Sequence, residues 1–358
     1  MGVLKEPHII DLPRKIVIGR GVIDRLGLYL KELLGSREEG KVVVVTGHTV
    51  GKLYYPVIKE SVENIGLEPI RVIIDSSTVD EAERVYREIR QIADKVVAII
   101  GLGGGKSIDV AKYSSRKIGK PFISVPTVAS HDGITSPFAS LKGFGKPISK
   151  LAQAPLMILI DTDIIAEAPQ RFNRAGFGDI IGKYTAVRDW RLAHRLKGEY
   201  YGGYAASLAL MSARHVTKHV DEIAAGTEEG LRILLEALVS SGVAMCIAGS
   251  TRPASGSEHL FAHAVTMIVK NPPLHGELVG LGTIMMSYLH GMNWKLIKRL
   301  LERVGLPTAA EELGLDRDVV IKALTMAASI RPERYTILGE RGLTEEAAKR
   351  LVKVTGVA

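Results

Sequence analysis

The sequence predicts two domains: an α/β N-terminal domain with a parallel sheet, followed by an all-α C-terminal domain. Short β-branched apolar runs alternate with helix-forming segments up to residue 170. Strands and helices alternating at this spacing favour a parallel sheet that helices cover on both faces. From residue 171 onward the apolar segments are longer and spaced as in helices. We therefore expect domains at 1–170 and 171–358.

The composition is that of an ordinary globular enzyme. The chain has 358 residues, of which 46% are hydrophobic and 24% charged, and this length suits about two domains. The single cysteine, Cys246, excludes a disulfide framework and suits a reducing compartment. The net charge of +8 is spread along the chain, which favours small phosphorylated ligands over nucleic acid.

Neither a membrane span nor a secretory signal is expected. No segment reaches the roughly 18 uncharged apolar residues that a membrane span requires. The first residues carry charge and a proline where a signal peptide needs an apolar core. We therefore expect a cytoplasmic protein without membrane insertion.

The elements of the first domain follow from apolar runs and helical spacing. Strands are expected within 9–23 and at 42–45, 70–74, 96–100, 121–126 and 157–163, and helices at 22–34, 53–65 and 78–93. The last of these helices has Asp80 and Glu81 in its first turn, where acidic side chains are favourable. In the second half, helices are expected at 179–194, 204–220, 228–246, 257–269 and 278–290.

A glycine-rich segment joins the strand at 96–100 to the next helix. Its residues are Gly101, Leu102, Gly103, Gly104 and Gly105. Glycines at a strand-to-helix turn let the backbone approach an anion, and the free N–H groups of the helix favour a phosphate. A tight turn without a ligand is the simpler alternative, which the flanking Lys106, Ser107 and Asp109 make less favourable.

Two well-known phosphate motifs do not fit this segment. A Walker A loop would need glycine at position 100, where Ile100 stands. The G-x-G-x-x-G pattern would need its third glycine at position 106, where Lys106 stands. The small, polar segment from Thr127 to Asp132 follows the next strand and is expected to close over a ligand.

Asp179, His259, His263 and His275 are the candidate metal ligands in the second half. Asp179 follows a glycine-rich stretch before an apolar helix, where a carboxylate commonly caps a helix. His259 and His263 are four residues apart and so share one helix face, and His275 precedes the next helix. A packed structural histidine is the alternative for each. One Asp and up to three His suit a borderline cation such as Zn²⁺ with open coordination positions.

These motifs together resemble the sn-glycerol-1-phosphate dehydrogenase family. The matching segments run through the whole chain in the family's order: G-G-G-K-S-I-D at 103–109, T-V-A-S-H-D-G at 127–133, G-D-I-I-G-K at 178–183, G-S-E-H-x-x-x-H at 256–263 and P-P-L-H-G at 272–276. This family is the archaeal branch of the dehydroquinate synthase, glycerol dehydrogenase and iron-containing alcohol dehydrogenase superfamily. The resemblance implies a Rossmann-like, dehydroquinate synthase-like NAD(P)-binding domain and a helical metal- and substrate-binding domain.

The resemblance also assigns roles to individual residues. Asp179, His259 and His275 would hold one zinc ion per subunit. His263 would face the substrate instead. The four-residue spacing alone does not distinguish His263 from His259 as a metal ligand. Asp132 and His263 would be catalytic and would contact the substrate together with Asp179. The NAD or NADP would be bound by Gly103, Gly104, Gly105, Lys106, Ser107, Ile108, Asp109, Thr127, Val128, Ala129, Ser130 and Ser136.

The activity that the resemblance implies is the reversible reduction of dihydroxyacetone phosphate to sn-glycerol 1-phosphate, for archaeal ether lipids. It also implies a homo-oligomer. Lys183 and Arg252 lie near the ligand motifs and are our candidates for binding the substrate phosphate. The expected strand at 42–45 is followed by Thr46, Gly47 and His48, without the acid that favours NAD, so NADPH should be tolerated.

Three alternatives remain open. A glycerol dehydrogenase would share the metal ligands but act on unphosphorylated glycerol or dihydroxyacetone. A dehydroquinate synthase would show no net consumption of NADH. A nucleotide-sensing protein without catalysis would have no need of an open metal site.

Overall fold

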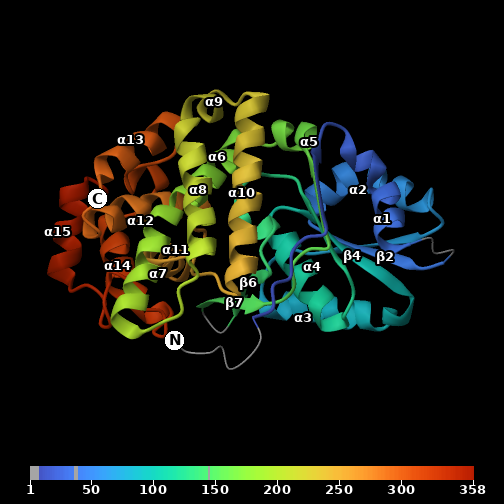
Figure 1. Cartoon of the computed structure of the whole chain (residues 1–358), viewed down its shortest axis with the longest axis horizontal. Helices are drawn as coiled ribbons and strands as arrows, with labels where there is room; N and C mark the ends of the chain where they lie inside the picture. Colours follow the sequence, from blue (N-terminus) through green and yellow to red (C-terminus); the bar gives the residue numbers. More distant parts are fainter. Residues whose placement is uncertain (1–7, 36–38, 144–145) are drawn as a thin grey trace. The chain divides into compact units, whose positions relative to one another are not determined.

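The computed structural model describes residues 8–35, 39–143 and 146–358 (Figure 1). The chain divides into two compact units. Asp11–Val128 and Gly133–Ala168 form one, which we call the sheet unit. The other unit consists of Ala129–Asp132, Pro169–Ala358 and the described N-terminal residues 8–10, and we call it the helical unit. The domains predicted at 1–170 and 171–358 stay a prediction; the units differ from them chiefly by placing 129–132 with the helices.

The sheet unit contains a six-stranded parallel sheet in the order β1-β8-β5-β4-β2-β3. Its strands are β1 (Lys15–Gly19), β2 (Lys41–Thr46), β3 (Glu68–Ile73), β4 (Val96–Gly103), β5 (Phe122–Pro126) and β8 (Met157–Asp161). The central strand β4 is buried along its whole length, as its β-branched sequence predicts. The fold class predicted for this half is confirmed.

Helices and a hairpin complete the sheet unit. The helices are α1 (Leu26–Leu34), α2 (His48–Glu63), α3 (Val79–Arg90), α4 (Gly105–Ile118) and α5 (Thr162–Glu167). The hairpin consists of β6 (Phe138–Gly143) and β7 (Lys146–Leu151), which are antiparallel. The hairpin was not expected from the sequence, because neither strand contains an apolar run.

The helical unit confirms the predicted all-α second half. Its helices are α6 (Gln170–Ile181), α7 (Lys183–Lys197), α8 (Gly203–Lys218), α9 (Val220–Ala225), α10 (Glu228–Ala248), α11 (Ser257–Ile268), α12 (His275–Leu289), α13 (Trp294–Val304), α14 (Arg317–Ile330) and α15 (Glu345–Thr355). Figure 1 shows α8 and α10 side by side, and α11 packs against both α12 and α14.

One predicted helix is wrong. The segment expected to be helical from 179 to 194 is two helices, α6 and α7, which meet at Gly182. A Cβ at Gly182 would lie 2.8 Å from Cγ1 of Val279, so the break occurs where the backbone passes close to α12. Asp179 therefore lies in the last turn of α6 and does not cap a helix.

The backbones of α6 and α12 come unusually close. A Cβ added to Gly178 would lie 2.2 Å from the carbonyl oxygen of Gly276, and one added to Gly276 would lie 1.8 Å from that of Ala175. Only glycine fits such contacts. Since Asp179 follows Gly178 and His275 precedes Gly276, this packing brings two predicted ligands together.

Helix α10 is long and apolar enough to cross a membrane by composition alone. Its best window has a mean hydropathy of 1.8, but 67% of that window is buried inside the protein. Arg232 and Glu236 interrupt its apolar sequence. These properties fit the core helix of the helical unit.

We predict that Gly276→Ala destabilises the protein. The added methyl group must displace the backbone of α6, and overpacking of this kind costs about 1–3 kcal/mol or more. Thermal unfolding should therefore show a lower midpoint than for the unmodified protein. Gly203→Ala is the control, because a Cβ there meets nothing within 4 Å. Equal midpoints for the two variants would contradict the packing argument.

Candidate active site

Asp179, His259 and His275 converge in the helical unit. One ligand atom from each can be chosen so that all three lie within 4.8 Å of one another. Asp179 comes from the last turn of α6, His259 from the first turn of α11 and His275 from the start of α12. Asp179 and His259 are buried, and His275 is partly exposed. The structure thus brings together the three residues predicted as metal ligands.

Asp179 is oriented by its neighbours. Its Oδ2 accepts a hydrogen bond from the backbone N–H of Asp132 at 3.0 Å. Its Oδ1 lies 3.3 Å from Nζ of Lys183 and 3.3 Å from Nε2 of His259. Burial raises the pKa of Asp179, but the charge of Lys183 and the contact with His259 outweigh burial and hold it below its usual value. Asp179 is therefore an ionised carboxylate.

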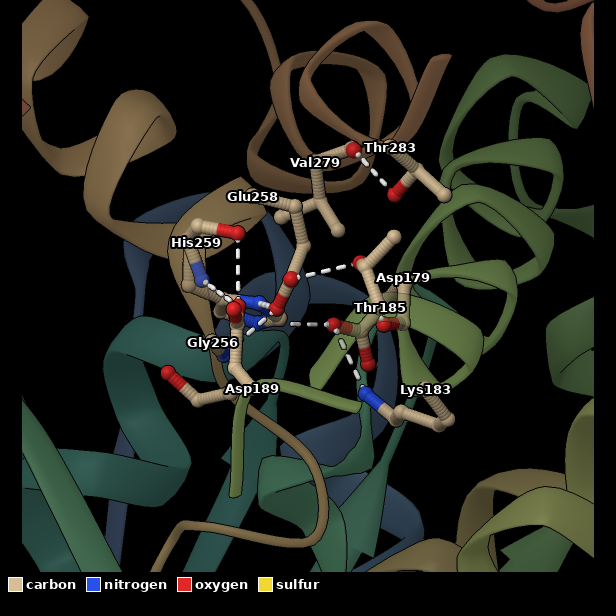
Figure 2. A network of polar contacts seen from close by, with 12 residues as sticks. Asp179, Lys183, Thr185, Asp189, Gly256, Glu258, His259, Val279 and Thr283 are labelled. Carbon is tan, nitrogen blue, oxygen red and sulfur yellow. Dashed lines mark hydrogen bonds and ion pairs between the residues drawn. The ribbon is translucent and has the colours of Figure 1, made fainter. Parts of the chain in front are cut away.

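Glu258 fixes the orientation of the His259 ring (Figure 2). Nδ1 of His259 lies 2.8 Å from Oε1 of Glu258, and because a carboxylate only accepts, Nδ1 carries the proton. Glu258 is itself held by the backbone N–H of Gly256 at 2.6 Å and the hydroxyl of Thr185 at 2.6 Å. This is the carboxylate–histidine arrangement that orients metal-binding histidines.

The contact between His259 and Asp179 favours a cation between them. When Nε2 carries no proton, its lone pair faces Oδ1 of Asp179, 3.3 Å away. Two acceptors at this distance repel unless a proton or a metal ion lies between them. Burial lowers the pKa of His259, but its bonds to Asp179 and Glu258 outweigh burial and raise it above the ordinary value. The residues present therefore fit a metal ion.

His275 and His263 are neutral imidazoles. Burial and then the charge of His259 lower the pKa of His275 to about 3. Burial and then the charge of Arg331 hold the pKa of His263 well below its ordinary value. The ring centroids of His263 and His275 are 5.9 Å apart, and those of His259 and His275 are 5.0 Å apart. His263 thus lies beside the three ligands without belonging to the group.

Asp132 belongs to a buried ion cluster with Lys183. Its Oδ2 lies 2.8 Å from Nζ of Lys183 and accepts a hydrogen bond from the hydroxyl of Ser241 at 2.7 Å. Burial lowers the pKa of Lys183, but Asp132 and Asp179 outweigh burial and raise it, so the lysine is charged. Lys183 therefore neutralises two carboxylates.

The predicted nucleotide segment starts at the end of β4. Gly103 has a φ of +139°, Gly104 precedes α4, and Gly105, Lys106 and Ser107 form the first turn of α4. A Cβ at Gly103 would lie 2.9 Å from Oγ of Ser107, so this turn requires glycine. The side chains of Ile108 and Asp109 are buried, the latter 3.8 Å from Nζ of Lys112.

The second group of predicted nucleotide residues is divided between the units. Thr127 and Val128 lie in the sheet unit, and the N–H of Thr127 donates to the carbonyl of Gly103 at 3.2 Å. Ala129 and Ser130 lie in the helical unit, where the N–H of Ala129 donates to Oδ1 of Asn173 at 3.0 Å. Ser136 is buried in the sheet unit, and its hydroxyl donates to the carbonyl of Phe138 at 3.2 Å.

Glu258, Thr185 and Ser241 belong to the site but were not expected there from the sequence. The signal for Glu258 was present, because a carboxylate directly precedes His259. Thr185 and Ser241 had no signal, since only the fold brings them to their partners. Arg252, a candidate for the substrate phosphate, is bound by the carboxylate of Glu199 and by the carbonyl of Tyr335 at 3.0 Å.

Comparison with known proteins gives full-length relatives. The chain is 63% identical over 351 residues to "Glycerol-1-phosphate dehydrogenase [NAD(P)+]" of Aeropyrum pernix, covering 98% of both chains. It is 55% identical over 350 residues to the protein of that name from Hyperthermus butylicus, covering 98% of this chain and 99% of the relative. The chain belongs to the glycerol-1-phosphate dehydrogenase family. The family resemblance read from the motifs is thereby confirmed, and the protein is an oxidoreductase.

A family model and solved structures agree with the fold. The model of iron-containing alcohol dehydrogenases matches residues 17–169. The structure of glycerol dehydrogenase from Schizosaccharomyces pombe is similar, with a TM-score of 0.81 at 23% identity, covering 98% of this chain and 91% of that one. A probable glycerol dehydrogenase from Sinorhizobium meliloti has a TM-score of 0.80 at 21% identity, covering 98% of both. At these identities the likeness shows the fold alone.

We predict that Glu258→Ala weakens metal binding about 10- to 100-fold, as loss of such an orienting carboxylate commonly does. The ring of His259 then loses the acceptor that fixes its proton on Nδ1. Glu258→Gln keeps an acceptor for Nδ1 and should lose less. Competition with a chromophoric chelator measures the affinity.

The control is Glu228→Ala, an exposed carboxylate at the start of α10. An affinity for Glu258→Ala equal to that of the control would show that Glu258 does not orient the metal ligand.

Proposed function

We propose that this protein catalyses the reversible reduction of dihydroxyacetone phosphate by NADH or NADPH to sn-glycerol 1-phosphate, for archaeal membrane ether lipids. The observation that carries the proposal is the convergence of Asp179, His259 and His275 within 4.8 Å in a chain of this family. The relatives at 50–63% identity are named for glycerol 1-phosphate and NAD(P)+.

We propose zinc as the metal, one ion per subunit, held by Asp179, His259 and His275. The donor set of one carboxylate and two imidazoles suits Zn²⁺ and also suits Fe²⁺, for which the matched family model is named. The bound metal would polarise the ketone of the substrate as a Lewis acid. Metal content of the purified protein decides between the two ions.

The protein's own residues prepare the site for this reaction. Lys183 keeps Asp179 ionised and pairs with both Asp179 and Asp132, which fixes the positions of the two carboxylates. Glu258 fixes the proton of His259 on Nδ1, which leaves Nε2 free to bind the metal. His263 is neutral, so it meets the substrate as a hydrogen-bonding imidazole without adding a charge. Asp132 and His263 are proposed to contact the substrate hydroxyl groups.

The dinucleotide would be bound by the glycine turn after β4. The first turn of α4 presents free backbone N–H groups and the positive end of the helix dipole, which suit a pyrophosphate. Thr46 ends β2, and Gly47 and His48 follow it without an acid. Asp75, two residues after the end of β3, is paired with His48 at 3.0 Å. We therefore propose that NADPH is accepted as well as NADH.

We also propose a cytoplasmic homo-oligomer. The buried single cysteine suits a reducing compartment. Exposed apolar side chains on one stretch of the helical unit support self-association: Tyr200, Tyr204 and Met211 are each more than half exposed. Light scattering coupled to size-exclusion chromatography measures the number of chains.

The activity test compares two ketones with and without metal. We predict that the protein oxidises NADH or NADPH with dihydroxyacetone phosphate much faster than with dihydroxyacetone. A chelator should abolish the reaction, and added Zn²⁺ should restore it. His259→Ala should also abolish the reaction, whereas His215→Ala, an exposed histidine of α8 outside the ligand group, should leave it unchanged.

Two results would contradict the proposal. Turnover confined to dihydroxyacetone would place the protein with the glycerol dehydrogenases. Full activity of a chelated protein free of metal would exclude a catalytic role for the Asp179, His259 and His275 group.

A further inference from the structure

We propose that Arg331, supported by Arg334, binds the phosphate group of the substrate. The inference deepens the proposed function and rests on it, because it names the residues that would distinguish a phosphate ester from the free ketone.

Both arginines lie directly after α14. The helix ends at Ile330, and Arg331 is followed by Pro332, whose ring disfavours a helical conformation in the preceding residue. Arg331 accordingly has a φ of −138° and a ψ of 81°, outside the helical range. Since α14 packs against α11, the end of α14 delivers these side chains near the helix of His259 and His263.

Arg334 is fixed to the loop that enters α11. Its Nη1 donates to the carbonyl of Ser255 at 2.6 Å, and its Nη2 donates to the hydroxyl of Thr251 at 2.6 Å. Ser255 lies two residues before α11 begins. Arg334 therefore has a defined position relative to the helix that carries the metal ligand His259.

Arg331 has no such partner. Within the part of the chain that the structure describes, its guanidinium makes no hydrogen bond or ion pair, and only Glu333 nearby offsets its charge. The guanidinium is partly buried, and burial lowers its pKa. Arg331 lies three residues before Arg334, whose side chain is bound to the segment that enters α11, so this segment places Arg331 near the start of the helix that carries His259. The five N–H donors of the Arg331 guanidinium therefore have no protein acceptor among the described residues and can bind a ligand.

The local charge balance favours a bound anion. Arg252, Arg331 and Arg334 lie close enough that burial and the charges of the other two lower the pKa of Arg334 to about 9. The carboxylate of Glu199 is already paired with Arg252, which donates to it through Nε and Nη2. Like charges crowded away from solvent are unfavourable unless an anion compensates them. A phosphate dianion matches the fork geometry of arginine.

Two other cationic side chains, Lys183 and Arg252, are already paired with protein groups. Lys183 lies between Asp132 and Asp179, and Arg252 is bound by Glu199 and the carbonyl of Tyr335. These were the sequence-based candidates for the phosphate. Their protein partners leave Arg331 as the better anion-binding group.

The first test uses the complete metal-loaded enzyme. We expect Arg331→Ala to lower the ratio of kcat/KM for dihydroxyacetone phosphate to that for dihydroxyacetone by about 10- to 100-fold, the range for loss of a charged hydrogen bond. Most of the change should be in KM. Arg331→Lys keeps the positive charge but cannot make two parallel hydrogen bonds to the phosphate, so the ratio should fall less than in Arg331→Ala. Arg317→Ala, exposed at the other end of α14, should leave the ratio unchanged.

The second test measures binding without turnover. Isothermal titration calorimetry with sn-glycerol 1-phosphate and with inorganic phosphate should show binding to the unmodified protein and at least about tenfold weaker binding to Arg331→Ala. Thermal unfolding of each variant verifies that it is folded.

The outcomes separate the two claims. A ratio and affinities within about twofold of the unmodified protein would overturn the role of Arg331 while leaving the proposed function intact. If dihydroxyacetone phosphate is not reduced at all, phosphate binding that depends on Arg331 still supports an anion site, and binding independent of Arg331 refutes it.

Discussion

The candidate active site depends on the close backbone contact between α6 and the start of α12. Gly178 and Gly276 permit it, because any side chain at either position would overlap a carbonyl of the facing segment. Asp179 and His275 are the chain neighbours of these glycines, so the distance between two ligands is fixed by main-chain packing. Rigid elements hold ligands more precisely than loops do.

The buried charges around this contact are compensated one by one. Lys183 neutralises Asp132 and Asp179, while Glu258 is satisfied by His259, Thr185 and a backbone N–H. Uncompensated charges at such depth are strongly unfavourable. Asp189 connects further segments, since it accepts from the backbone and hydroxyl of Ser257, from the ring of His290 and from the backbone of Ile337. The same carboxylate thus fixes the start of α11 and the loop that follows Arg331 and Arg334.

Most of the fold could be predicted because burial leaves a periodic signal. The β-branched runs gave the strands of the parallel sheet, and helical spacing gave most helices of the second half. The break at Gly182 was missed, since glycine alone does not reveal a neighbouring helix. The hairpin of β6 and β7 was missed because it lacks an apolar run. At the site, acid and histidine types indicated the ligands, whereas the partners of Lys183 and the isolation of Arg331 depend on contacts between distant segments.

The most direct test of the central claim is anomalous X-ray scattering from crystals of the purified protein at the zinc edge. We expect one strong anomalous peak per chain, within bonding distance of Asp179, His259 and His275, and its loss in His259→Ala. A peak at the iron edge instead would change the metal but keep the site. If an active preparation shows no anomalous peak among these three residues, they do not hold a catalytic metal.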